Sequence, residues 1–222
     1  MSRDSTEIEA REKPLPRKKD PKKKGRHKRG RPKKGEKRAQ KEPSVLEKQV
    51  LMSYDELMNS FSTGCDVGCK KNSKGNTEVW IGYKLHLDVV DGDIPVTSLL
   101  SSASVHDSQV AIPMAELTHR RITHCYDLMD AAYDSSIIRD HARRLGHVEI
   151  IDHNPRRGEK IPFDPAKKVR YKQRSSVERV NGRLKDSFGG RYVRVKGPAK
   201  VFAHLMFGVL ALTADQLLRL VS

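Results

Sequence analysis

Four polar residues in the last quarter of the chain have a spacing that places them on one face of a helix. They lie at i, i+4, i+7 and i+11 and are Arg174, Glu178, Asn181 and Lys185. Apolar residues occupy an adjoining face that would pack on a core, namely Val177, Leu184 and Phe188. A carboxylate among basic side chains suits a metal-dependent enzyme acting on phosphate backbones, with Glu178 holding a metal ion. The spacing also fits a solvated face with an Arg174–Glu178 ion pair worth roughly a few tenths of a kcal/mol, and spacing alone leaves both interpretations open.

A longer pattern surrounds this helix. Its residues are arranged as Tyr-x2-Arg-x3-Glu-x6-Lys, from Tyr171 to Lys185. The pattern resembles the signature of bacterial insertion-sequence transposases of the DDE class. The stretch Asp4–Thr6 resembles the "DST" that carries the family's first catalytic aspartate, and Asp130–Asp134 resembles the "D-x-x-Y-D" block that carries the second. Other stretches similar to the family are Trp80–His86, Val105–Ser108 and Lys185–Arg191. The similarity covers nearly all of the chain, although residues 7–75 match mainly in their general character and not in particular motifs.

The resemblance implies an α/β fold, a ribonuclease H-like mixed sheet flanked by helices. That fold would bring together three acids as the catalytic and metal-binding set: Asp4 on the first strand, Asp130 ending the fourth and Glu178 on a late helix. Three such carboxylates hold two divalent ions roughly 3.5–4 Å apart, with Asp4 bridging both by similarity. Oxygen ligands favour Mg2+, with Mn2+ as a substitute. The implied activity is transposition, in which DNA strands are cleaved at the ends of an element and the freed 3′-hydroxyl is joined to target DNA.

The resemblance also implies DNA contacts near the scissile bond. Arg174 and Lys185 would hold backbone phosphates, and Tyr171 would brace or stack against a nucleotide. The implied partners are double-stranded DNA, both as element end and as target, and a second copy of the chain in a homodimeric synaptic complex.

Each acid has a simpler interpretation when taken alone. Asp130 would be a strand-end or helix-capping residue, and Asp4 a solvated acid near a terminus. Two neighbours compete with Asp130, and we expect Asp134 to be an N-cap and Asp127 to lie inside an apolar strand. We expect Asp107 or Ser108 to cap a helix, although Asp107 could lie near the site, and Asp152-His153 to be a loop feature. The ordered set of three, rather than any single acid, favours catalysis.

The chain is strongly basic, with a formal net charge of +16 over 222 residues, so an anionic polymer is the expected partner. The three cysteines, Cys65, Cys69 and Cys125, are an odd number that forms no disulfide framework and suits a reducing cytoplasm. A zinc site at Cys65 and Cys69 is less favoured than two free thiols. No apolar run reaches the ~18 residues that would span a membrane. We therefore expect a soluble cytoplasmic protein that associates with the nucleoid.

Residues 7 to about 43 are dominated by Lys, Arg, Pro and Gly, and we expect them to be disordered when free. Arg29 and Arg31 lie in an Arg-Gly-Arg-Pro core that resembles an AT-hook, which lies in the narrow minor groove of A·T-rich DNA. A generic basic linker that contacts phosphates anywhere fits equally well. In both cases DNA binding should weaken steeply with salt.

The remaining pattern alternates strands and helices. We expect a helix over 44–60, a loop over 61–76 and a hairpin of strands at 79–89 and 94–101, turning at 91–93. A helix should follow at 109–120, then a strand at 122–129, a helix at 135–145 and a strand at 148–151. After a loop over 154–168 come the signature helix and a packing helix at 198–220.

These elements divide the chain into residues 1–6, the remnant of a first strand, residues 7–75, a basic insertion with a short helix, and residues 76–222, the catalytic domain. Only three residues precede Asp4, whereas a central strand normally has about five or six residues. We therefore expect an N-terminally truncated transposase whose first strand and activity are weakened. The alternatives are a catalytically inactive DNA-binding remnant and a ribonuclease H-like nuclease without a role in transposition.

Overall fold

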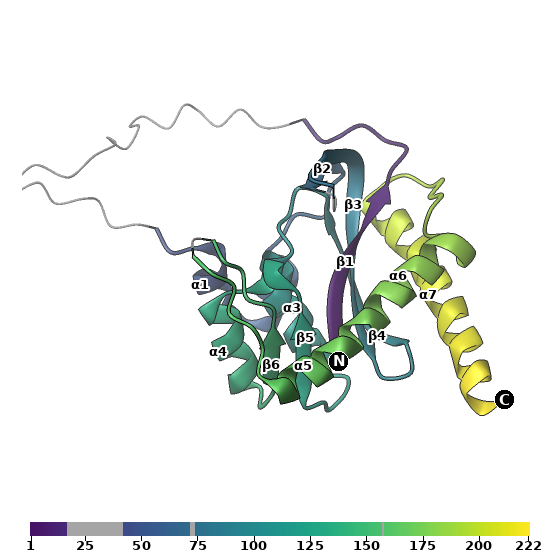
Figure 1. Ribbon diagram of the computed structural model, residues 1–222. Helices are drawn as coiled ribbons and strands as arrows, with labels where there is room; N and C mark the ends of the chain where they lie inside the picture. The colour runs from purple at the N-terminus through teal and green to yellow at the C-terminus, as the bar shows by residue number, and fades with distance from the viewer. Residues whose placement is uncertain (17–41, 72–73, 157) are drawn as a thin grey trace, which may run out of the picture.

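The computed structural model describes residues 1–16, 42–71, 74–156 and 158–222 (Figure 1). The expectations for residues 17–41, including the minor-groove contacts of Arg29 and Arg31 and most of the stretch 7–43 expected to be disordered, lie outside this described part.

A mixed sheet forms the centre of the molecule. Its strands, as far as the chain is described, are β1 (Ser2–Glu9), β2 (Asp66–Lys71), β3 (Thr77–Val90), β4 (Ile94–Ser102), β5 (Tyr126–Met129) and β6 (Val148–Ile151). The order is β2-β3-β1-β5-β6, and β4 pairs with β3. Strand β1 is antiparallel to β3 along its whole length, and β5 is parallel to both β1 and β6. The carboxyl ends of β1 and β5 therefore point the same way.

Helices cover both faces of this sheet (Figure 1). They are α1 (Val45–Gln49), α2 (Tyr54–Met58), α3 (Ser108–His119), α4 (Ser136–Arg144), α5 (Pro165–Tyr171), α6 (Ser175–Ser187) and α7 (Pro198–Val221), with 3-10 turns η1 (Ala131–Tyr133) and η2 (Lys172–Arg174). One core joins β3 to α6 and α7 through residues such as Leu87, Leu184 and Leu205. A second joins β5 and β6 to α3 and α4, through Met129, Ile151 and Ile138. The expected ribonuclease H-like α/β fold is confirmed.

The alternation in β3 predicts its buried face only in part. Side chains at Tyr83, Leu85 and Val89 are fully buried. Val79 is 64% exposed and Ile81 is 42% exposed, because this first part of β3 pairs with β2 and extends beyond the core beneath α6 and α7. The alternation therefore identifies the strand correctly but does not show where its burial beneath α6 and α7 ends.

Several boundaries differ from the expected ones. The helix expected over 44–60 is two short helices, because a second capping box, formed by Ser53 and Glu56, starts a new helix after the first. The loop expected over 61–76 contains β2, a largely polar strand that pairs with β3. Strand β5 begins at Tyr126, four residues later than expected.

The first strand is longer than the boundary at residue 6 suggests. β1 has eight residues and continues past Asp4 to Glu9. Its last three residues therefore lie within the segment assigned to the basic insertion. Its pairing with its two neighbours is unequal. All eight residues pair with β3, whereas Ser2 alone is in register with β5, opposite Leu128. The strand is thus anchored mainly through its antiparallel neighbour.

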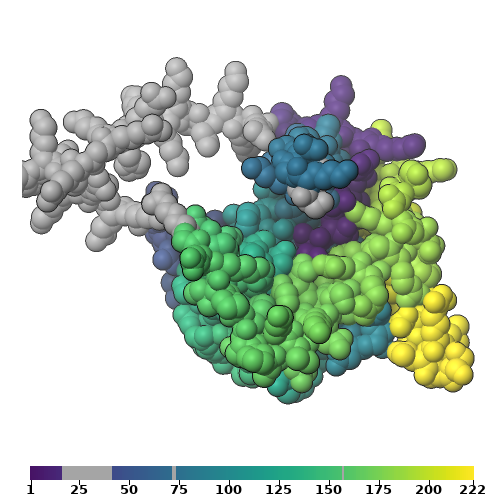
Figure 2. Space-filling view, viewed as in Figure 1, coloured from purple at the N-terminus to yellow at the C-terminus, as the bar shows by residue number. Residues whose placement is uncertain are grey.

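Helix α7 is long and apolar enough, by length and composition alone, to cross a membrane, and 22% of its most apolar window is buried. One face carries Val201, Leu205 and Leu212, which belong to the core with β3 and α6, so the expected packing role is confirmed for that face. The C-terminal end projects from the body of the molecule (Figure 2), and Phe207 and Leu218 are exposed.

Candidate active site

The three acids expected at the catalytic site meet at a single arginine. The guanidinium of Arg174 lies 3.3 Å from Asp4 Oδ2 and 3.6 Å from Asp130 Oδ2 through Nη2. Its Nη1 lies 2.5 Å from Glu178 Oε1. Residues separated by as many as 174 positions are therefore brought together, as the order of the motifs predicts.

Each acid is held by a different element. Asp4 lies within β1 opposite Leu87, and its Oδ1 accepts a hydrogen bond of 2.8 Å from the backbone N–H of Ser5. Asp130 follows the last residue of β5, and its Oδ1 accepts a bond of 2.9 Å from the N–H of Ala132, which caps η1. Glu178 lies in the first turn of α6. Asp130 therefore caps η1, as its simpler interpretation expects, and also lies beside the same arginine as the other two acids.

The signature segment is less regular than a single helix. Tyr171 ends α5, Arg174 ends the 3-10 turn η2, and Glu178 follows in α6. The turn directs Arg174 inward, so that its side chain is 15% exposed. Along the expected polar stripe Asn181 is buried and Lys185 is largely buried, whereas Glu178 is 56% exposed, so only part of the stripe is a solvated face.

Burial governs the electrostatics of the acids. It raises the pKa of Asp4 to about 7, although the positive charge of Arg174 opposes the rise. Burial also raises the pKa of Asp130, against the hydrogen bond from Ala132. Carboxylates that are costly to ionise gain most from a nearby cation, and a divalent ion supplies more charge than a guanidinium.

The donor set fits hard divalent ions. Asp4, Asp130 and Glu178 offer only oxygen atoms, which Mg2+ and Mn2+ prefer. One oxygen of each acid faces the guanidinium of Arg174, so this positive group stands where the carboxylates converge and a metal ion would be bound.

The other two signature residues, Tyr171 and Lys185, contact residues other than the three acids. Lys185 Nζ donates to Glu7 Oε1 at 2.7 Å, and Lys70 Nζ donates to Glu7 Oε2 at 2.8 Å. Burial opposes the ionisation of Glu7, but these two lysines outweigh it and lower its pKa to about 2. The ring of Tyr171 packs on Phe163, with ring centroids 4.7 Å apart.

A fourth carboxylate near the site was underestimated from the sequence. Asp107 stands at the cap position of α3, but its side chain makes no capping hydrogen bond with the described residues, so the expected cap is wrong. It accepts instead a hydrogen bond of 3.0 Å from Lys84 Nζ. Its negative charge contributes to the raised pKa values of Asp4 and Asp130. In the sequence, the His106-Asp107-Ser108 stretch was the feature that could have indicated this additional carboxylate near the site.

The competing acids have other partners. Asp134 is not an N-cap, because Ser135 holds that position in α4, and it binds Arg139 and the backbone N–H of Asn154. Asp127 lies within β5, as expected. Asp152 pairs with Lys160 at 2.8 Å in the loop after β6.

Comparison with known protein families agrees with this arrangement. Residues 60–214, more than half of the chain, match the model of the transposase DDE domain. The chain therefore belongs to the transposase DDE domain family, whose members generally use divalent metal ions. Asp130 and Glu178 lie inside the matched residues, and Asp4 lies before them. No curated protein and no solved structure matches the chain.

Proposed function

We propose that this protein catalyses metal-dependent cleavage of DNA at the ends of a mobile element and transfers the freed strand into target DNA. The observation that carries the proposal is the convergence of Asp4, Asp130 and Glu178, from three distant elements, on one guanidinium. Two Mg2+ ions bound by these acids would activate the attacking hydroxyl and stabilise the leaving 3′-oxygen.

The chain's own residues have distinct tasks in this proposal. Asp4, Asp130 and Glu178 bind the ions through oxygen atoms. Arg174, relieved of its ion pairs with the acids, contacts a backbone phosphate next to the scissile bond. Lys185 exchanges its contact with Glu7 for a second phosphate, and Tyr171 braces a nucleotide.

The proposed partners follow from the charge of the chain and from the reaction. A net charge of +16 favours double-stranded DNA, both as element end and as target. Two ends must be held together for transfer, which a homodimer would achieve in a synaptic complex. A protein acting on chromosomal DNA would be associated with the nucleoid in the cytoplasm.

Binding of Mn2+ by calorimetry tests the site. We would measure it at pH 8, above the pKa of about 7 of Asp4, so that the carboxylates are ionised. Glu178→Gln should weaken Mn2+ binding by more than about tenfold, since even residues behind the ligands contribute that much. Asp186→Asn, an exposed acid on the same helix that pairs with Arg191, is the matched control and should leave binding unchanged.

A second variant separates metal binding from DNA contact. Arg174→Gln removes the cation that competes for the acids, so Mn2+ should bind at least as tightly as in the wild type, while cleavage of DNA ends is lost. Equal weak Mn2+ affinity in wild type and Glu178→Gln would contradict the proposed site. DNA binding without any metal-dependent cleavage by the wild type would instead support the alternative, a catalytically inactive DNA-binding remnant.

A further inference from the structure

A second cluster of metal-ligand side chains lies away from the three acids. His124 precedes β5, Asp127 lies on β5 and His147 directly precedes β6. Because β5 and β6 are adjacent parallel strands, these side chains meet at the start of both strands. One ligand atom from each residue lies within 4.8 Å of the other two. Asp127 is three residues before Asp130, so the cluster lies about 10 Å along the strand from the catalytic end.

The aspartate at the centre of the cluster is shared between the two imidazoles. His124 Nε2 lies 2.8 Å from Asp127 Oδ1, and His147 Nδ1 lies 3.1 Å from Asp127 Oδ2. The imidazole centroids are 3.9 Å apart. The ligand atoms therefore already converge on one small volume, as binding of a single metal ion requires.

The cluster is buried and its hydrogen bonding is incomplete. The side chains of Asp127, His147 and His124 are 1%, 3% and 7% exposed, respectively. The Nδ1 atom of His124 is buried and has no hydrogen-bond partner among the described residues. A buried polar atom without a partner costs roughly 1–3 kcal/mol, so the His124 ring would gain from a bound ion or water molecule that satisfied it.

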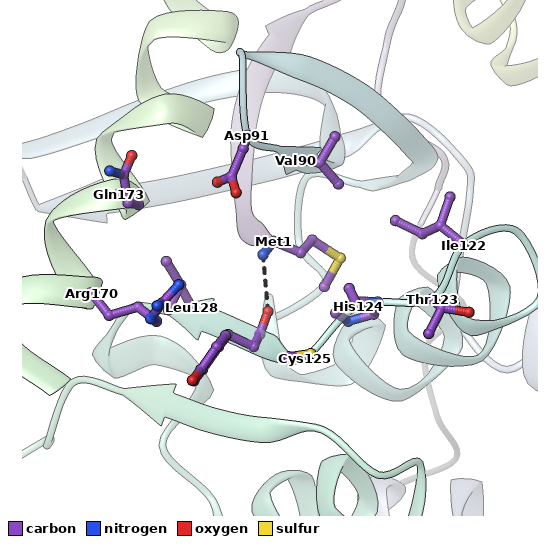
Figure 3. Close-up of a pocket in the computed structure, with 11 residues that line it drawn as sticks. Met1, Val90, Asp91, Ile122, Thr123, His124, Cys125, Leu128, Arg170 and Gln173 are labelled. Carbon is purple, nitrogen blue, oxygen red and sulfur yellow. Dashed lines mark hydrogen bonds between the residues drawn. The ribbon is translucent and has the colours of Figure 1, made fainter. Parts of the chain in front are cut away.

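A cavity lies beside His124. It has a volume of about 430 Å³ and is lined by His124 together with Met1, Cys125 and Arg170 (Figure 3). Since His124 is the member of the cluster that lines this cavity, an ion arriving from it would meet the His124 ring first.

The chemistry of the ligands identifies the class of ion. Two imidazole nitrogens and one carboxylate oxygen are the ligands of borderline ions such as Zn2+, which commonly take three protein ligands and a water molecule. The catalytic acids, which are all oxygen donors, favour Mg2+ instead. We propose that His124, Asp127 and His147 bind one Zn2+ ion that fastens the starts of β5 and β6 together, at a site separate from the catalytic metals.

Cobalt provides a direct test with the full chain. After treatment with a chelator, one equivalent of Co2+ should produce visible absorption bands typical of low-coordinate nitrogen and oxygen ligation, and Zn2+ should abolish them by displacement. At a hundredfold excess over the dissociation constant, Zn2+ should also raise the unfolding temperature by roughly 5–10 °C. Absence of these bands in the wild type would overturn the proposal.

Variants assign the bands to these residues. His124→Gln should abolish them and the thermal shift, and near-native circular dichroism of this variant shows that it has folded. His119→Gln is the matched control, since its ring centroid lies 5.5 Å from that of His147 but it is outside the cluster. Glu178→Gln should also retain the bands, which separates this site from the catalytic one. Bands that survive in His124→Gln would show that Co2+ binds elsewhere and would refute the assignment.

Discussion

The residue before Asp4 is expected to be the main anchor of β1. Arg3 is 1% exposed and Asp88, its partner on β3, is fully buried. The pair is bidentate, with Nε–Oδ1 and Nη2–Oδ2 distances of 2.7 Å each. Arg3 Nη1 also donates to the carbonyl oxygen of Ala111 at 3.0 Å, and the Thr118 hydroxyl donates to Asp88 Oδ2 at 2.5 Å. One ion pair thus joins β1, β3 and α3.

Replacing Arg3 by methionine should destabilise the protein severely. The substitution keeps apolar volume but leaves the Asp88 carboxylate buried without its cation, which typically costs about 3–5 kcal/mol. A domain of this kind has a total stability of about 5–15 kcal/mol, so the loss is a large fraction of it. Because Asp4 follows Arg3 directly, a loosened β1 should weaken Mn2+ binding as well.

Urea denaturation followed by far-ultraviolet circular dichroism measures the effect. The control is Arg191→Met, which removes an arginine that is 54% exposed and pairs with the exposed Asp186, and it should cost less than about 1 kcal/mol. The double variant Arg3→Met/Asp88→Leu removes both charges and should recover most of the lost stability. A loss below about 1 kcal/mol in Arg3→Met, or no recovery in the double variant, would refute the reasoning.

Two further predictions concern stability. Burial lowers the pKa of His86, whose Nε2 lies 2.8 Å from Ser101 Oγ, to about 4, so the unfolded chain binds more protons than the folded one between pH 6.5 and 4. His86 should therefore lower stability by about 2 kcal/mol from pH 7 to pH 5. Because Asp4, whose pKa is about 7, titrates in the same range with the opposite sign, this effect is measured as the difference in pH dependence between wild type and His86→Gln, and equal pH dependence in both would contradict it. Gly208→Ala should cost roughly 1–3 kcal/mol in thermal unfolding, because the new Cβ would collide with the carbonyl oxygen of Phe188. The matched Gly182→Ala, which meets open space on α6, should instead stabilise by about 0.5–1 kcal/mol, and similar effects of the two would refute the packing argument.

Local patterns predicted the elements that have one clear period and missed those that depend on distant partners. The β3–β4 hairpin and α7 follow from alternation and from apolar spacing. Strand β2 was missed because Asp66–Lys71 is largely polar, and it becomes a strand only because β3 extends far enough to pair with it. The break between α1 and α2 was in the sequence, as the capping box at Ser53, but apolar spacing concealed it.

The same contrast between local patterns and distant partners applies to the candidate site. The order of the acidic motifs predicted that Asp4, Asp130 and Glu178 come together, as they do. Spacing alone gave the Arg174–Glu178 pair, since it is a local i, i+4 contact. The contacts of Arg174 with the other two acids depend on how η2 turns the chain over β1 and β5, which no local pattern contains. The buried Arg3 was missed for a similar reason, because arginine is almost never buried without a partner that sequence alone cannot assign.

The way in which the acids are held indicates which of them must move when ions bind. Asp4 and Asp130 each have Oδ1 held by a backbone N–H and turn Oδ2 toward Arg174, so these hydrogen bonds also hold the second oxygen in place. Glu178 is 56% exposed, and it forms an ion pair with Arg174. If the acids bind ions as proposed, the two aspartates already provide fixed oxygen ligands. Release of Arg174 then frees Glu178 to complete the site, so metal binding and the freeing of an arginine for phosphate are one coupled change.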